Sequence, residues 1–297
     1  MSTGAPSPGF ALYGPRLRKQ LRMLRRQADL TQEEVARDMD WSTSKVIRIE
    51  GGDVRISVTD LRALLALYHI TDKGQVEALV HMARQARSRP WWNSYRGIID
   101  QPYMEYIAYE DSATSIQTFE PLVIPGLLQT REYAESVVQE LNSPRVPANV
   151  ANMTEIRMER QKILQKGPSA PRLTCVIDES VIRRDTTEPQ AMARQLKAIL
   201  ELTQQIDLTV RVTPFTAGFH PGLSGPFIIL GLPGDHEDVL FRETWKGMEQ
   251  KDHFTGEDDP NPHVIEHKQI FAEILEIALP AEATRDLFEK RIAAIEA

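Results

Sequence analysis

The sequence predicts an α+β protein, with an N-terminal all-α helix-turn-helix domain followed by a domain that mixes helices and strands. Three observations support this class: helical apolar spacing throughout the first third, strand-like apolar runs only after it, and a charge balance that changes sign between the two parts. The 297 residues are about twice the length of one typical domain. Hydrophobic residues make up 41% and charged residues 26%, which excludes a collagen-like or wholly disordered chain.

Residues 15–89 are expected to form a compact bundle of five helices, preceded by a flexible N-terminus at residues 1–14. In the first helix, leucine recurs at spacings of three and four, and arginines occupy the other faces. Thr31, followed three residues later by Glu34, has the form of a capping box and predicts the start of a second, short helix. The five helices are expected to begin near residues 15, 31, 43, 57 and 72.

Residues 90–111 are expected to be a linker, because Pro90 disfavours continuation of a helix and the composition changes after it. Residues 112–297 are expected to form an α+β domain. Helices are expected at residues 129–141, 151–165, 189–205 and 262–278, and from residue 280 to the end. Strands are expected at residues 172–177, 208–212, 226–232 and 239–244.

Charge is distributed unevenly along the chain. Through Arg89 there are 15 lysines and arginines against 10 acidic residues, whereas the remainder has 20 against 32. Because phosphate binding depends on the local field, the basic third suits nucleic acid although the net charge is −7. The single cysteine, Cys175, cannot form an internal disulfide, which fits a reducing compartment. The chain shows no signal-like start and no membrane-length apolar run, so we expect a cytoplasmic protein without membrane contact.

The two short helices that flank residues 40–42 have the size and spacing of a helix-turn-helix unit, whose second helix enters the major groove of DNA. With Val46 and Ile49 facing inward, the outward side of that helix carries groups suited to base edges and phosphates. Arg48 is expected to pair with guanine, and Gln32 to contact a phosphate at the start of the preceding helix. Spacing alone leaves open a helical bundle that binds no DNA. The predicted DNA-binding residues are Gln32, Ser42, Thr43, Ser44, Lys45 and Arg48.

The run that begins at Leu30, LTQEEVARDMDWSTSKVIRIEGG, together with the arginine-rich helix before it, resembles the lambda-repressor-like, XRE-type helix-turn-helix domain. In that family an arginine of the first helix pairs with the glutamate that ends the recognition helix. The resemblance therefore implies a structural ion pair between Arg25 and Glu50. The chain departs from the family at Asp40, where a turn glycine is usual, and at Gly52, where a basic residue is common. The second departure implies weaker phosphate contact after the recognition helix.

Four stretches of the C-terminal part, FEPLVIPGLLQTREYA, RMERQKIL, VIDESVIRR and TAGFHPGLSGPFIIL, resemble the C-terminal domain of WhiJ-like actinobacterial regulators, a domain of unknown biochemical function. The resemblance runs from about Ser112 to the C-terminus and implies a regulator whose companion is often a small protein encoded nearby.

Together these features predict a cytoplasmic, sequence-specific transcription regulator that is controlled through its C-terminal domain. Because one recognition helix reads only a few base pairs, we expect a homodimer on double-stranded DNA. The alternative is an antitoxin-like protein that holds a small partner protein and autoregulates its own operon.

A rival signal for an enzyme is the sequence H-x-x-E-H, formed by His263, Glu266 and His267, which has the inverted zincin order. Such enzymes need a further carboxylate ligand many residues downstream, and only 30 residues follow His267. A chance match on a polar helix face is therefore favoured over a zinc hydrolase. No catalytic residue, metal or cofactor is expected.

The Gly/Pro-rich stretch at residues 213–225 joins two of the predicted strands. It lacks both the P-loop and the G-x-G-x-x-G order, so it is not expected to bind phosphate. Phe215, Phe219 and His220 are candidates for the lining of a ligand pocket beside the sheet. The alternative is that these side chains pack the loop against the sheet.

Overall fold

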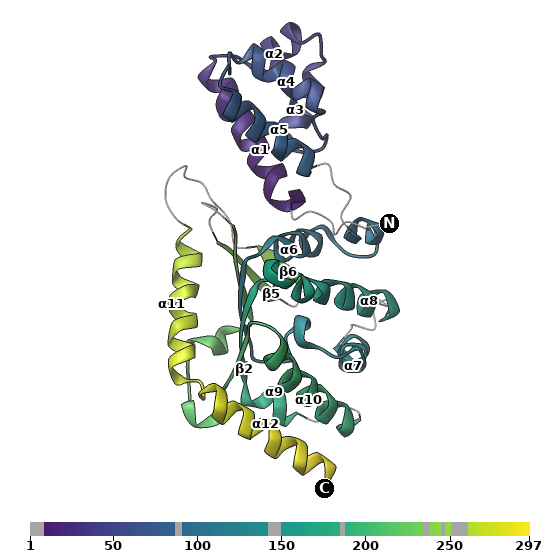
Figure 1. Cartoon of the computed structure of the whole chain (residues 1–297), viewed down its shortest axis with the longest axis vertical. Coiled ribbons are helices and arrows are strands. Elements are labelled where there is room, and N and C mark those ends of the chain that lie inside the picture. Colours follow the sequence, from purple (N-terminus) through teal and green to yellow (C-terminus); the bar gives the residue numbers. More distant parts are fainter. Residues whose placement is uncertain are drawn as a thin grey trace. The chain divides into compact units, whose positions relative to one another are not determined.

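The computed structural model describes residues 9–86, 91–141, 150–184, 188–233, 238–244, 247–250 and 261–297. The chain divides into two compact units, Met1–Arg96 and Gly97–Ala297, which we call unit 1 and unit 2. Unit 1 is helical, whereas unit 2 combines helices with a sheet (Figure 1). The predicted α+β class, with an N-terminal all-α domain, is therefore confirmed.

Unit 1 folds around one hydrophobic cluster to which Leu17, Leu21 and Leu24 of its first helix contribute. These leucines recur at helical spacing, so they form one buried stripe along that helix. Residues 9–14, which belong to the predicted flexible N-terminus, are part of the first helix instead. The helices are α1 (Gly9–Gln27), α2 (Gln32–Asp38), α3 (Thr43–Gly51), α4 (Val58–Leu67) and α5 (Lys73–Ala86), followed by a 3-10 helix at Trp91–Tyr95.

Local interactions set the ends of α2 and α3. The predicted capping box is present: Thr31 Oγ1 accepts from the backbone N–H of Glu34 at 3.2 Å, and Glu34 Oε2 accepts from the N–H of Thr31 at 2.8 Å. Asp40 in the turn between the helices has φ 53°, and Gly52 after α3 has φ 97°, so both are left-handed. A Cβ atom on Gly52 would lie 2.6 Å from the flexible guanidinium of Arg18, so the left-handed backbone is the main reason for glycine at the end of α3.

Unit 2 is built on a mixed sheet, for which the described residues give six strands in the order β3-β2-β1-β4-β5-β6. The strands β1, β2 and β3 are parallel, whereas β4, β5 and β6 continue from β1 in antiparallel pairs. Parallel neighbours need long crossovers, which are helical here between β1 and β2 and between β2 and β3. The strands are β1 (Ser115–Glu120), β2 (Arg172–Asp178), β3 (Leu208–Thr213), β4 (Phe227–Gly231), β5 (Val239–Thr244) and β6 (Gly247–Gln250).

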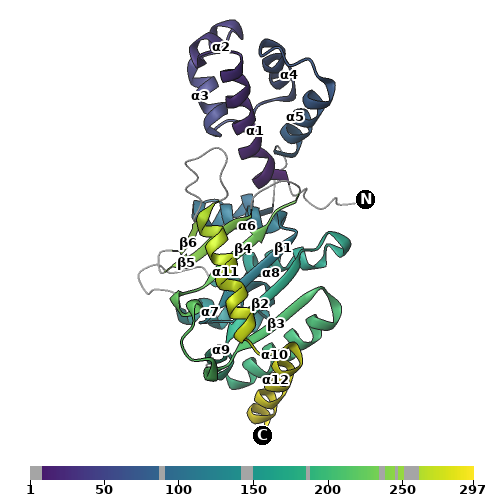
Figure 2. The same cartoon turned by 90° about the vertical axis from the view of Figure 1, so that its left-hand side faces the viewer.

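Helices cover both faces of this sheet (Figures 1 and 2). On one face lies α11, whose Phe271 and Ile274 pack into a cluster with Phe119 and Val176 of the sheet. On the other face lie α6, α7, α8 and α10, and α12 packs against α10 and β3. The helices are α6 (Gln101–Ser112), α7 (Arg131–Leu141), α8 (Val150–Gln161), α9 (Glu179–Arg183), α10 (Pro189–Gln205), α11 (Pro262–Ile277) and α12 (Ala281–Glu296).

The structure differs from the sequence prediction at residues 90–111 and in the sheet. The region predicted as a linker contains α6, which buries Tyr106 and Glu110 in unit 2. Its apolar residues do not recur at the spacing of an amphipathic helix, so the pattern gave no signal. The sequence pattern also predicts no strand at the positions of β1 and β6. The central strand β1 carries the buried polar residues Thr118 and Glu120, and therefore lacks the continuous apolar run typical of a strand covered on both faces.

Replacement of Asp40 by glycine is expected to stabilise the turn between α2 and α3. A side chain in the left-handed region costs about 1 kcal/mol relative to glycine, which corresponds to about a fivefold change in an equilibrium constant. Amide hydrogen exchange of α3, measured in the full chain, should therefore slow by about this factor in Asp40→Gly.

The matched control is Asp38→Gly, the same change at a helical position two residues earlier. Glycine destabilises helical backbone, so exchange of α2 should accelerate in this variant. Faster exchange of α3 in Asp40→Gly would contradict the prediction and would show that the aspartate side chain stabilises the turn.

Candidate nucleic-acid interface and ligand cavity

The helix α3 has a buried side and an exposed side. Val46, Ile49 and Glu50 are buried in unit 1, whereas Ser44 and Arg48 are exposed to solvent. The buried side anchors the helix, so the exposed side presents its groups on a fixed backbone. This is the arrangement that a helix needs in order to read a groove of duplex DNA.

Ser42 and Lys45, two predicted DNA-binding residues, already have partners within unit 1. Ser42 Oγ accepts from the backbone N–H of Lys45 at 3.2 Å and so caps the N-terminus of α3, where Thr43 is half-buried. Lys45 Nζ lies 3.2 Å from Oδ2 of Asp60 and 3.7 Å from the ring centroid of Trp41. The Lys45 and Asp60 side chains are each about one-third exposed, so exchanging this ion pair for a phosphate costs little.

A buried network fixes the C-terminal end of α3 to α1 and α2. Glu50 is only 4% exposed and accepts from Arg25 Nε at 2.8 Å and from Arg25 Nη2 at 3.2 Å. Arg25 also donates to the carbonyl oxygen of Leu30 at 2.8 Å, and Arg22 donates to the carbonyl oxygen of Glu50 at 2.8 Å. The hydrogen bond to Glu50 raises the pKa of Arg25. The ion pair is thus part of the scaffold that holds α3.

The same carboxylate holds Gln32, the residue predicted to contact a phosphate. Gln32 Nε2 donates to Glu50 Oε2 at 2.7 Å, which ties the start of α2 to the end of α3. The half-buried amide has a second N–H, and the N-terminal backbone N–H groups of α2 lie beside it. Gln32 can therefore anchor α2 to Glu50 and contact a phosphate at the same time.

The structure does not assemble Phe215, Phe219 and His220 into a pocket. Phe219 is 100% exposed and Phe215 is largely exposed, whereas the half-buried His220 packs its ring edge-on against Phe119. The sequence placed both phenylalanines beside the sheet because they follow β3 in a Gly/Pro-rich loop. In the structure that loop turns its aromatic rings outward.

The H-x-x-E-H residues lie on α11, and no metal-binding arrangement is built around them. His263 and Glu266 are exposed, and His267 Nδ1 lies 2.8 Å from the carbonyl oxygen of His263. Burial lowers the pKa of His267. Within the described ranges, no three His, Cys, Asp or Glu side chains are grouped so as to hold a metal ion.

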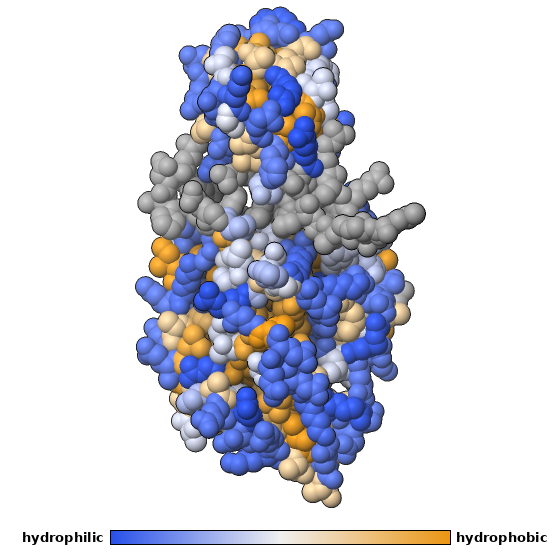
Figure 3. Space-filling model, in the orientation of Figure 1, coloured by the Kyte–Doolittle hydropathy of each residue, from blue (hydrophilic) through white to orange (hydrophobic). Residues whose placement is uncertain are grey.

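Hydrophilic side chains cover most of the face drawn in Figure 3, and apolar side chains gather in a band along unit 2. Among the helices that the structure describes, none is both long and apolar enough to cross a membrane.

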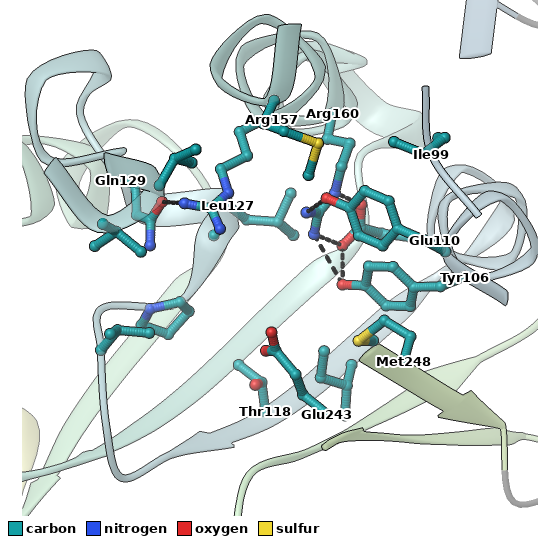
Figure 4. A pocket seen from close by; sticks show the side chains of 18 of the residues that line it. Ile99, Tyr106, Glu110, Thr118, Leu127, Gln129, Arg157, Arg160, Glu243 and Met248 are labelled. Carbon is teal, nitrogen blue, oxygen red and sulfur yellow. Dashed lines mark hydrogen bonds and ion pairs between the residues drawn. The ribbon is translucent and has the colours of Figure 1, made fainter. Parts of the chain in front are cut away.

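A cavity of about 860 Å³ lies within unit 2, between the sheet and the helices α6 and α8 (Figure 4). Ile116, Thr118 and Glu120 line it from β1, since alternate residues of a strand face the same side. The intervening Phe119 faces α11 on the other side of the sheet. Further lining residues include Tyr103, Tyr106, Glu110, Leu127, Gln129, Val138, Met153, Arg157, Arg160, Ile228, Glu243 and Met248.

One wall of the cavity is a closed ion pair between Arg160 and Glu110. Arg160 Nε and Nη2 donate to the two carboxylate oxygens of Glu110, both at 2.7 Å. The hydroxyls of Tyr103 and Tyr106 accept from Arg160 Nη1 and Nη2 at 2.8 and 2.9 Å. All three guanidinium nitrogens are therefore occupied, and the pair is electrically neutral.

The other polar groups of the cavity are not satisfied in this way. Among the described residues, Glu120 and Glu243 have no hydrogen-bonded or ion-paired partner, and neither does the buried Thr118 hydroxyl. Burial, followed by the charge of Glu243, raises the pKa of Glu120 well above its usual range. Arg157 donates to Gln129 Oε1 at 3.1 Å but forms no ion pair with a described carboxylate, and burial lowers its pKa. Glu120, Glu243 and Thr118 are therefore the polar groups of this cavity that lack a hydrogen-bond partner among the described residues.

Sequence reasoning missed the whole cavity. The available signals were a threonine and a glutamate at alternate positions of a strand-like segment, SIQTFE, and two arginines three residues apart in RMERQKIL. Both patterns place charge on faces that ought to be apolar in a packed domain. Because the prediction assigned α6 to a linker and omitted β1, these residues could not be brought together.

Comparison with protein families gives two matches. Residues 16–79 match the model of a helix-turn-helix domain, which covers α2 and α3 with the helices around them. Residues 103–290 match the model of a domain of unknown function, DUF5753, which covers the sheet of unit 2 and the cavity. No curated protein and no solved structure shows a significant match. The DUF5753 model spans more than half of the chain, which therefore belongs to the DUF5753 family and carries an N-terminal helix-turn-helix domain.

Proposed function

We propose that the protein is a sequence-specific transcription regulator of the XRE type, which inserts α3 into the major groove of DNA. The observation that carries this proposal is the exposed face of α3 on a helix whose other face is fixed by burial and by the Glu50 network. The helix-turn-helix family match supports DNA binding by this unit.

Each residue of the interface has a distinct role in this proposal. Arg48 is exposed and reads a guanine through two hydrogen bonds, and Thr43 and Ser44 contact base edges. Lys45 leaves Asp60 for a phosphate, and Ser42 and Gln32 position the ends of the two helices against the backbone. Base recognition then depends on Arg48, Thr43 and Ser44, whereas the other interface residues position the helices on the DNA backbone.

The charge distribution favours contact through unit 1 alone, because the acidic remainder of the chain is repelled by phosphates. A single recognition helix reads only a few base pairs, so we expect a homodimer on a palindromic site with half-sites about 34 Å apart or a multiple of this. Control of DNA binding through unit 2, and a small protein partner of the antitoxin type, stay predictions from the sequence resemblance.

The Arg48→Ala variant is expected to lose about 1 to 3 kcal/mol of binding free energy at the cognate site, which is about a 5- to 150-fold loss of affinity. Binding to random duplex should change much less, because guanine recognition is specific to one base pair. The measurement is fluorescence anisotropy of the full chain on a site obtained by in vitro selection.

The matched control for this variant is Arg62→Ala, since Arg62 is an exposed arginine of α4 that pairs with Glu77. This variant should keep the ratio of cognate to random affinity. An equal loss on both duplexes in Arg48→Ala would show that Arg48 contacts phosphate and does not read a base.

The Gln32→Ala variant is expected to weaken binding to cognate and random duplexes alike, because the residue positions α2 and the end of α3 without reading a base. The control is Gln75→Ala, an exposed glutamine of α5. If Gln32→Ala changed the preferred sequence while Gln75→Ala did not, Gln32 would be a recognition residue.

Affinity should fall steeply with salt if positively charged side chains displace counterions from DNA. With about six to ten phosphate contacts, the affinity is expected to drop about 10³- to 10⁵-fold between 50 and 200 mM salt. A titration series in KCl with the full chain measures the slope. A flat response would contradict a DNA interface made by the basic unit.

A further inference from the structure

We propose that the cavity of unit 2 binds a small organic cation, a primary amine with an apolar body, whose ammonium group lies between Glu120 and Glu243. The cavity belongs to the matched DUF5753 domain, for which no biochemical function is known. The proposal follows from the charges, the geometry and the lining of this cavity.

The charge balance of the lining leaves a negative excess around these two glutamates. Arg160 and Glu110 neutralise each other through two hydrogen bonds. The other charged lining residues are Arg157, Glu120, Glu243 and Asp100, of which three are acidic. A cationic ligand reduces this negative excess, whereas an anion would face the carboxylates.

The two glutamates stand at the same end of the sheet and on the same face. Phe227 of β4 pairs with Phe119 on one side and with Arg242 on the other, and each glutamate follows one of these partners. The strands β1 and β5 therefore place Glu120 and Glu243 on either side of β4, with about 10 Å between their backbones. An ammonium group between their side chains has a carboxylate on each side.

Thr118 supplies the third acceptor for such a group. Its hydroxyl is buried and has no partner among the described residues, and it lines the cavity two positions before Glu120. In Figure 4 both Thr118 and Glu243 belong to the sheet, which is drawn below the helices. A primary ammonium has three N–H donors, one for each of the acceptor groups of Glu120, Glu243 and Thr118.

An unsatisfied buried carboxylate is a stronger indication of a ligand than an exposed one. Glu120 is only 6% exposed, and a group so buried is normally hydrogen-bonded or paired. Burial and the neighbouring Glu243 raise its pKa, so the charged form is disfavoured while the cavity holds no cation. A bound ammonium reverses that preference by supplying the missing charge.

The rest of the cavity suits an apolar body of limited size. Its volume of about 860 Å³ lies in the range of small-molecule sites. Apolar side chains such as Leu127, Val138, Met153 and Met248 line it. Glu243 is exposed, so the ligand reaches the acidic end from solvent. Arg157 faces the cavity opposite Glu243 (Figure 4) and is placed to donate to a carbonyl or hydroxyl on the ligand.

Binding of an amine does not depend on DNA binding, although a role as effector of transcription rests on the proposed function. The experiment therefore uses the full chain without DNA. Isothermal titration compares tryptamine, phenethylamine and hexylamine each with the alcohol that has the same carbon skeleton. Tryptamine is also compared with indole-3-propionate. The three compounds of the indole series share one ring system and differ in charge.

We expect at least one amine to bind at least tenfold more tightly than its alcohol, and tryptamine to bind more tightly than indole-3-propionate. Equal affinity of amine and alcohol, preference for the propionate, or no binding of any of the three amines would overturn the proposal.

The site is located by two variants, Glu243→Gln and Glu120→Gln, which keep the shape of the side chain and remove its charge. Each should weaken amine binding by tenfold or more. The matched control is Glu276→Gln, an exposed glutamate of α11 on the other face of the sheet, which should bind amines like the unaltered chain. Glu243 is exposed, so its variant remains informative if Glu120→Gln fails to fold.

Two results separate this proposal from the proposed function. Amine binding that survives in both glutamine variants would overturn the site, whatever the protein does to DNA. If the unaltered chain does not bind DNA at low salt, the proposed function is overturned. The amine site is unaffected by that result, since the amine titration contains no DNA.

Discussion

A carboxylate that leaves water needs a cation or several hydrogen-bond donors, and this constraint organises both units of the chain. In unit 1 the buried Glu50 receives donors from Arg25 and Gln32. In unit 2 the buried Glu110 receives two donors from Arg160. Glu120 is buried to a similar degree but has no such donor within the described part of the chain. The first two glutamates are structural, and the contrast marks the third as functional.

The Glu50 network explains how helices of seven and nine residues hold a defined position. Isolated helices of this length are unstable in water, so their order must come from tertiary contacts. One carboxylate at the end of α3 ties together α1 through Arg25 and the start of α2 through Gln32. The exposed face of α3 is thereby fixed in orientation by a contact that lies outside the interface itself. The exposed Ser44 and Arg48 are not needed to hold the helix in place.

The sequence predicted unit 1 well because its signals are local. A capping box at Thr31 and a stripe of leucines in α1 depend on neighbours within a few residues. Unit 2 was predicted less completely because β1 and α6 are defined by distant partners. The segment that carries Thr118 and Glu120 is a central strand only because β2 and β4 flank it, and α6 is a helix whose polar residues face Arg160. The residues that hid these elements from pattern analysis are the residues that line the cavity.

This coincidence has a physical reason. A central strand would be more stable with apolar residues at positions 118 and 120, since unpaired polar groups in a sheet core cost free energy. The cavity likewise forgoes the packing that a filled core provides. Features that lower stability and break the binary pattern persist in a folded domain where a ligand compensates them, because binding to the folded state stabilises it. The failure of the pattern at β1 therefore points to the same face of the sheet as the cavity does.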